Sequence, residues 1–203
     1  KKQAGTIGHI GTTSFFPSKN LGGYGDGGAI LTQDESLARK IQAICDHGQL
    51  HQKYYHDIVG VNSRLDSIQA VVLRAKLQNL QEYEAARYQL AQEYTEGLRG
   101  IESILTPLES SFSSHVYHQY TLKILDGKRD ALKKHLESHQ IPSMIYYPLP
   151  LHYQGAYKHY LMGNEDLKIS ERLAGEVLSL PMHTEMEDEQ RDYILNAIKS
   201  FYQ

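Results

Sequence analysis

The sequence predicts an α/β protein, and three features support that class. Short stretches rich in β-branched and aromatic residues, typical of strands, alternate with segments whose apolar residues recur at helical spacing. Glycine or proline marks many of the boundaries between them. The composition changes at Gly100, after the longest helical pattern. We therefore expect a first domain over residues 1–100 that ends in a long connecting helix, and a small α/β domain over residues 101–203.

The first part of the chain contains two strand patterns and a helical one. Residues 10–16 and 29–32 have the strand composition, and a glycine-rich turn separates them. Asp34 is the expected N-cap of a helix that reaches about residue 47. Gly48 is the expected stop, because glycine readily adopts the left-handed backbone that ends many helices.

The longest helical pattern starts at Asp66 and ends at Gly97 or Gly100. Asp66 and Gln69 have the spacing of a capping box, in which two side chains bond to the backbone at a helix start. A helix of about 30 residues is about 45 Å long at 1.5 Å per residue. That length is unusual inside one domain and suggests a bridge between two.

The remaining half of the chain alternates between strand and helix patterns. Pro148 and Pro150 interrupt it once, because proline lacks the backbone N–H that regular elements require. Strands are expected at residues 115–125, 143–147 and 178–181, and helices at residues 129–140, 167–177 and 187–201.

The composition argues against several classes of protein. Lys and Arg number 21 against 24 Asp and Glu, which gives a net charge of −3, whereas a nucleic-acid-binding surface needs a basic excess. No apolar run approaches the roughly 18 residues of a membrane span, and no signal-peptide pattern opens the chain. Cys45 is the single cysteine, so a reducing compartment, the cytoplasm, is expected. We expect neither a nucleic acid nor a membrane as partner.

Metal binding is not expected either, although the chain contains 11 histidines. His47 and His51 are four residues apart, which is the spacing of a zinc-binding pair on a helix. Gly48 falls between them and breaks the helix that such a pair requires. Most of the histidines are therefore expected at the surface or in loops.

Lys19 is the residue whose setting most needs a chemical explanation. It follows Phe15, Phe16 and Pro17 and precedes five glycines in residues 20–28. A phosphate-binding P-loop has its glycines before the lysine, so this order excludes it. Two interpretations stay open: a lysine in a surface turn, and a lysine whose amine bonds to a carbonyl cofactor. The second explains the glycines better, because they let a backbone pass close to a ligand.

Several segments together resemble the DegT/DnrJ/EryC1/StrS family of sugar aminotransferases. The family's cofactor-lysine segment corresponds to residues 14–22 (SFFPSKNLG) and 24–29 (YGDGGA). Its second signature corresponds to residues 60–70 (GVNSRLDSIQA). Two C-terminal signatures correspond to residues 146–152 (YYPLPLH) and 180–182 (LPM). The order and spacing of the segments agree along nearly the whole chain.

The resemblance implies a fold and a cofactor. The family has fold type I of the pyridoxal 5′-phosphate-dependent transferases, so the chain would hold the end of the large domain and the small C-terminal α/β domain. Lys19 would be the catalytic residue: it would bind pyridoxal 5′-phosphate covalently and then move a proton between substrate and cofactor. Ser14 would bind the cofactor phosphate through its hydroxyl.

The resemblance also implies a homodimer with shared active sites. The loop before Asn62 would come from the neighbouring subunit, so that Asn62 reaches the cofactor phosphate across the interface. Arg64 would face the nucleotide-sugar at the same opening. His152 and Tyr153 would line the sugar-nucleotide side of the site. For the tyrosines at 146–147, a position facing the site and a packing role are both open.

The implied reaction transfers an amino group to a keto nucleotide-sugar, with glutamate as the amino donor. The segments around Lys19 and at residues 146–152 are closest to the branch that acts on UDP-3-keto uronates. Products of such enzymes feed the assembly of surface polysaccharide, O-antigen and lipopolysaccharide. The dehydratase branch of the same fold replaces the lysine, usually with histidine, so Lys19 argues against it.

The start of the chain limits what the residues can do alone. The chain opens on Lys1, and no Asp precedes Lys19. The ring nitrogen of the cofactor needs a carboxylate, which the family supplies upstream of its lysine. We therefore expect a fragment that holds the lysine half of the site and cannot transaminate alone. The alternative is a non-catalytic subunit of the same fold that pairs with a chain carrying the other half.

Overall fold

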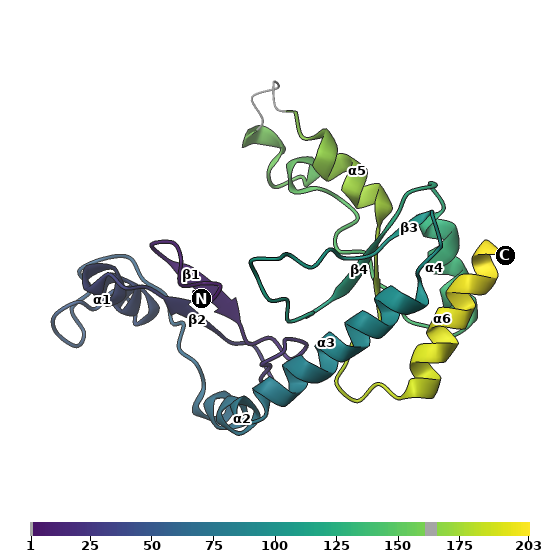
Figure 1. Cartoon of the computed structure of the whole chain (residues 1–203). Helices are drawn as coiled ribbons and strands as arrows, with labels where there is room; N and C mark the ends of the chain where they lie inside the picture. Colours follow the sequence, from purple (N-terminus) through teal and green to yellow (C-terminus); the bar gives the residue numbers. More distant parts are fainter. Residues whose placement is uncertain (1, 161–165) are drawn as a thin grey trace. The chain divides into compact units, whose positions relative to one another are not determined.

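The computed structural model describes residues 2–160 and 166–203, and it confirms the mixed α/β class (Figure 1). By its contacts the chain divides into two compact units, Lys1–Gln81 and Glu82–Gln203. The domain boundary near residue 100 that composition predicts stays a prediction.

The first unit contains a two-stranded antiparallel sheet and two helices. Strands β1 (Gly11–Ser14) and β2 (Gly28–Leu31) pair along their full length. Helix α1 (Glu35–Cys45) follows the sheet, and α2 (Ser67–Leu77) lies near the end of the unit. The strand pairing makes the glycine-rich segment with Lys19 the loop of a long hairpin.

Helix α1 begins after its predicted N-cap and ends at Cys45, shortly before the predicted end near residue 47. The Asp34 carboxylate accepts hydrogen bonds from the backbone N–H groups of Ser36 at 2.8 Å and Leu37 at 3.1 Å. A hydrogen bond from the Ser36 hydroxyl, followed by these two, holds the pKa of Asp34 below its usual value. His47, the first residue after the C-cap Asp46, and then Gly48 adopt the left-handed conformation typical just beyond a helix end, with φ of +61° and +83°.

The single long helix expected after Asp66 is wrong, because the structure has two helices there. Helix α2 stops at Leu77, and α3 (Leu80–Gly97) follows after a short turn. In that turn the N–H of Asn79 donates to the carbonyl of Lys76 at 3.0 Å. A bond between residues three apart tightens the chain and interrupts the ladder of an α-helix.

The second unit packs helices against a three-stranded antiparallel sheet in the order β3–β4–β5. Its core gathers buried apolar side chains from α3, β4, α4, β5 and α6. The strands are β3 (Ile104–Leu105), β4 (Tyr120–Ile124) and β5 (Val177–Leu180). The α-helices after α3 are α4 (Arg129–Ser138), α5 (Lys168–Glu176) and α6 (Asp188–Tyr202). Short 3₁₀ helices span Leu151–Tyr153 and Lys158–Tyr160.

The strands of this unit differ from the expectation. Strand β4 is shorter than the predicted 115–125, and residues 143–147 form no strand. Met144 pairs with Ser179 through two backbone hydrogen bonds of 3.0 and 2.7 Å. Prolines at 142 and 148 flank this segment, and proline cannot donate to a sheet. The sequence does not predict β3, because two residues are too few to show an alternation.

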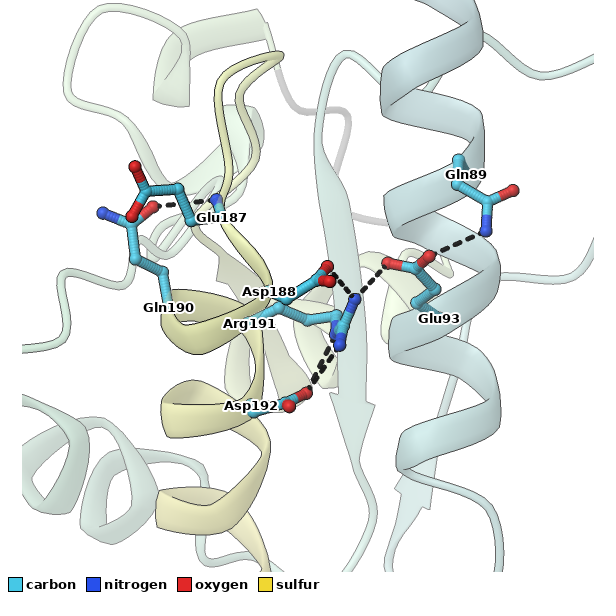
Figure 2. A network of polar contacts seen from close by, with 7 residues as sticks. All are labelled: Gln89, Glu93, Glu187, Asp188, Gln190, Arg191 and Asp192. Atoms are coloured by element: carbon cyan, nitrogen blue, oxygen red, sulfur yellow. Dashed lines mark hydrogen bonds and ion pairs between the residues drawn. The ribbon is translucent and has the colours of Figure 1, made fainter.

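Arg191 joins α6 to α3 (Figure 2). Its guanidinium lies 2.8 Å from Glu93 on α3, 2.7 Å from Asp188 and 2.9 Å from Asp192. The Arg191 side chain is 17% exposed, so the ion pair with Glu93 is partly shielded from water. Gln89 donates to the other oxygen of Glu93 at 2.7 Å. These hydrogen bonds, led by that from Gln89, lower the pKa of Glu93.

Candidate functional site

Lys19 lies in the loop between β1 and β2, which backbone hydrogen bonds close. Phe15 donates to the carbonyl of Gly27 and accepts from the N–H of Gly23, both at 2.8 Å. Inside that closure, the N–H of Lys19 donates to the carbonyl of Phe16 at 2.9 Å, which forms a turn. Lys19 itself is half-buried. Its amine is thus carried on a turn whose backbone is held on both sides.

Ser14 is the last residue of β1 and lies five positions before Lys19. Its hydroxyl oxygen accepts a hydrogen bond from the N–H of Phe16 at 3.2 Å. A serine hydroxyl also has one hydrogen to donate, and the residue is exposed. This geometry permits the donation to a phosphate oxygen that the sequence predicts.

The glycines after Lys19 are required by the loop itself. A Cβ at Gly22 would stand 2.4 Å from the carbonyl oxygen of Pro17. A Cβ at Gly23 would stand 2.9 Å from Oε1 of Gln69. The interpretation that the glycines serve the approach of a ligand is therefore incomplete, because at these two positions protein atoms occupy the space.

Asn62 and Arg64 lie together in the segment that leads into α2. The Arg64 guanidinium donates to Oδ1 of Asn62 at 3.1 Å and pairs with Asp46, just after α1, at 3.4 Å. The backbones of Asn62 and Asp46 also form a β-bridge. The Arg64 side chain is 62% exposed. No hydrogen bond that the structure describes joins Asn62 or Arg64 to Ser14 or Lys19.

His152 and Tyr153 lie in the second unit, and one carboxylate interacts with both. Nε2 of His152 is 3.2 Å from Oε1 of Glu171 on α5, and the His152 side chain is 11% exposed. A hydrogen bond with Glu171 raises the pKa of the Tyr153 phenol, because a nearby carboxylate opposes its ionisation. The centres of the His152 and Tyr153 rings are 4.3 Å apart.

A cavity of about 710 Å³ lies beside His152. Residues 146–152 line one part of it, and α5 supplies others such as Leu173 and Ala174. Tyr146 and Tyr147 are among its lining residues, and their role in the site stays a prediction. Its volume suits a small organic molecule.

The sequence does not predict the contacts of two residues, Gln69 and Glu171, with the candidate site segments. Gln69, expected to cap α2, instead accepts a hydrogen bond from the N–H of Tyr24 at 2.7 Å, and Asp66 makes no capping bond. Gln69 lies in the segment 60–70 that resembles a family signature, and this place is the signal that could have indicated a role for it in the site. Glu171 has no such signal, because acidic residues are common on the exposed side of a helix such as α5.

The described part of the chain offers neither a membrane span nor a cluster of metal ligands. No helix in residues 2–160 and 166–203 is long and apolar enough to cross a bilayer. Within the same residues, no group of three or more His, Cys, Asp or Glu side chains is placed to hold a metal ion.

Related sequences match along almost the whole chain. The model of the DegT/DnrJ/EryC1/StrS aminotransferase family matches residues 1–199. A pleiotropic regulatory protein of Geobacillus stearothermophilus is 42% identical over 99% of this chain and 54% of its own length. A UDP-N-acetyl-3-dehydro-alpha-D-glucosamine 3-aminotransferase of Acidithiobacillus ferrooxidans is 43% identical over 96% of this chain and 51% of its own. A UDP-2-acetamido-2-deoxy-3-oxo-D-glucuronate aminotransferase of Pseudomonas aeruginosa is 40% identical over 90% of this chain and 49% of its own length.

A solved structure shares the fold. The DegT DnrJ EryC1 StrS aminotransferase from Brucella abortus superposes with a TM-score of 0.90 at 41% identity. The match covers 97% of this chain and 52% of that one. The chain therefore spans about half the length of the relatives it matches, in structure as in sequence.

Proposed function

The chain belongs to the DegT/DnrJ/EryC1/StrS aminotransferase family, and from this premise we propose that the whole protein is a pyridoxal 5′-phosphate-dependent aminotransferase of keto nucleotide-sugars. Aminotransferases of this family depend on that cofactor, and one solved relative contains its amino form. Because the chain spans about half of its relatives, the activity is proposed for the whole protein. The observation that carries the proposal is the hydrogen-bonded turn that presents Lys19.

The residues at the Lys19 loop fit this cofactor. Lys19 supplies a primary amine on a turn that hydrogen bonds hold in place. Ser14 supplies an exposed hydroxyl with a hydrogen to donate to a phosphate oxygen. The cofactor, when bound, supplies an electron sink for the reaction. Nζ of Lys19 would hold the cofactor and move a proton to and from the substrate carbon.

The other predicted residues are assigned to the neighbouring subunit and to the substrate. In a homodimer, the exposed Asn62 would reach the cofactor phosphate of the partner's site. Arg64 suits a diphosphate, because its guanidinium presents several donors in a fixed fork. His152, which lines the cavity in the second unit, and the neighbouring Tyr153 would bind the sugar-nucleotide. The exposure of Asn62 and Arg64 supports such roles.

The names of two relatives support a UDP-3-keto sugar as substrate, since both describe amino transfer to position 3 of such a sugar. Within that class we favour the uronate, on the likeness of residues 14–19 and 146–152, with glutamate as the donor. A cytoplasmic location and a role in surface polysaccharide, O-antigen or lipopolysaccharide synthesis are further parts of this proposal.

Borohydride reduction of the whole protein tests the role of Lys19. After loading with pyridoxal 5′-phosphate and reduction, peptide mass spectrometry should find a pyridoxyl group on Lys19. Lys19→Ala should lose that group. It should also lose at least about 100-fold in the rate of 2-oxoglutarate release from glutamate and a UDP-3-keto sugar, because a catalytic base is removed.

Lys40→Ala is the matched control, because Lys40 lies exposed on α1 and the same charge is lost. It should keep both the adduct and the turnover. A wild-type protein without an adduct at Lys19, or a Lys19→Ala variant with unchanged turnover, would overturn the assignment. An adduct at Lys19 with no turnover on any keto nucleotide-sugar would reject the substrate class alone.

A further inference from the structure

The side-chain amide of Gln69 fills the space between two glycines that follow Lys19. Its Oε1 accepts from the N–H of Tyr24 at 2.7 Å. A Cβ at Gly23 would stand 2.9 Å from Oε1, and a Cβ at Gly25 would stand 3.1 Å from Nε2. Gln69 is half-buried. One side chain therefore bonds to the backbone of Tyr24 and lies close against the glycines on either side of it.

Lys76 attaches to the same loop at Gly22, the residue before Gly23. Its Nζ donates to the carbonyl of Gly22 at 2.9 Å, in a partly buried position. The same Nζ lies 4.9 Å from the centre of the Tyr24 ring, within the range of a cation–π attraction. A charged donor makes a stronger hydrogen bond than a neutral one, so Lys76 adds a second firm attachment.

Both side chains come from one face of α2. Seven residues make nearly two full turns of an α-helix, so Gln69 and Lys76 lie on the same side. Helix α2 also starts three residues after Arg64, and a Cβ at Gly27 would stand 2.9 Å from Cδ1 of Leu65, which lies between them. The helix thus connects the two segments that hold the predicted site residues of the first unit.

We propose that Gln69 is a positioning residue for Lys19 and that Lys76 assists it. The proposal rests on the proposed function of Lys19. Neither side chain needs to touch the reacting atoms. They fix the loop from the side of α2, while the hydrogen bond from Gly23 to Phe15 fixes it from the side of β1. Held between these two attachments, the loop keeps the backbone of Lys19 in place, and the position of a reacting group strongly affects the rate of a bonding step.

Replacement of Gln69 in the whole protein tests the proposal. Gln69→Leu keeps the size and removes the acceptor for the N–H of Tyr24. We expect about tenfold weaker binding of pyridoxal 5′-phosphate, the order of effect of losing one hydrogen bond. We also expect a shifted pH midpoint in the absorbance of the bound cofactor. Gln69→Glu keeps an acceptor in place and should bind within about threefold of the wild type.

The matched controls lie on the same helix. Gln78→Leu makes the same chemical change at the exposed C-cap of α2, and Arg74→Met removes an exposed cation as Lys76→Met removes a partly buried one. Neither control should alter the titration with cofactor. If Gln69→Leu and Lys76→Met both bind and titrate like the wild type, the proposal is wrong. A lower melting temperature alone, with affinity and pH midpoint unchanged, would also overturn it.

Hydrogen exchange separates this proposal from the proposed function. In the cofactor-free protein, Gln69→Leu should speed the exchange of the Tyr24 amide by about tenfold, and Gln78→Leu should not. A wild type without an adduct at Lys19 overturns the proposed function and the positioning role together. If the wild type carries the adduct at Lys19, and Gln69→Leu and Lys76→Met match it in cofactor affinity, pH midpoint and amide exchange, the positioning role alone is overturned. Should Gln69→Leu fail to fold, Lys76→Met against Arg74→Met decides by the same measurements.

Discussion

At the scale of single residues, Glu171 influences two predicted substrate-binding side chains at once. Its carboxylate lies 3.2 Å from Nε2 of His152 and raises the pKa of the Tyr153 phenol. An ordinary tyrosine loses its proton near pH 10. The Tyr153 phenol therefore keeps its proton, and its capacity to donate, to a higher pH.

Glu171→Gln should lower the pKa of Tyr153 toward its ordinary value of about 10, because the variant removes the negative charge and keeps the size. It should also raise the KM for the nucleotide-sugar, since the charged partner of His152 is lost. Ring-labelled tyrosine followed by NMR across pH measures the first effect, with Tyr153→Phe to assign the signal. An unchanged titration of Tyr153 in the variant would contradict the contact with Glu171, and the adduct at Lys19 should be unaffected.

At the scale of elements, the junction of α3 and α6 makes stability depend on pH. Glu93 has a pKa below its usual 4.5, through hydrogen bonds from Gln89 and then Arg191 (Figure 2). A carboxylate whose pKa is lower in the folded state stabilises that state above the unfolded pKa. The stabilisation is lost as the pH falls through the folded value. The free energy of unfolding should therefore decrease below about pH 4.5.

Glu93→Gln should lower the free energy of unfolding at pH 7 by about 1 kcal/mol, since a partly shielded, charge-assisted pair is lost. It should also reduce the further loss of stability in acid. Urea unfolding at neutral pH and at about pH 3.5 measures both effects. Glu137→Gln is the control, because its pair with Lys133 on α4 is more exposed. If Glu93→Gln loses stability in acid as steeply as the wild type, the pair does not cause the dependence.

Elements with a clear local signal could be predicted, and those without one could not. Asp34 caps the start of α1 through its own side chain, and Gly48 lies just beyond its end, so the sequence predicts the start and the approximate end. The break before Asn79 has no glycine or proline to announce it. Residues 143–147 have the composition of a strand, yet pairing with Ser179 is limited to one position. The tight turn at Asn79 and the prolines at 142 and 148 decide these two places.

At the scale of the whole molecule, the same distinction holds for the candidate site. The order of several short segments along the chain indicates the family and the cofactor lysine. The side chains that contact the site residues cannot be predicted in this way, because they come from other elements. Gln69 reaches Tyr24 across 45 positions, and Glu171 reaches His152 across 19. No periodicity links residues at such separations, so only the folded structure shows which side chains support Lys19 and His152.

The two units bury very different amounts of apolar surface. The hydrophobic core cluster lies entirely within residues 82–203. In the described part of the first unit, Ala43 and Leu73 are the buried apolar residues, whereas Val59 is 96% exposed and Ile68 75%. Burial of apolar surface is the main favourable contribution to folding. The second unit should therefore fold by itself, and the first should not.

Expression of each unit alone checks this prediction. Residues 82–203 should unfold cooperatively in urea with about 5 kcal/mol of stability, and near-ultraviolet circular dichroism should report their buried tyrosines. Leu122→Ala should cost this piece about 3 kcal/mol, because Leu122 is fully buried in β4. Residues 1–81 alone should show a gradual change without a transition. A cooperative transition in residues 1–81, or none in residues 82–203, would show that stability does not follow the distribution of buried apolar side chains.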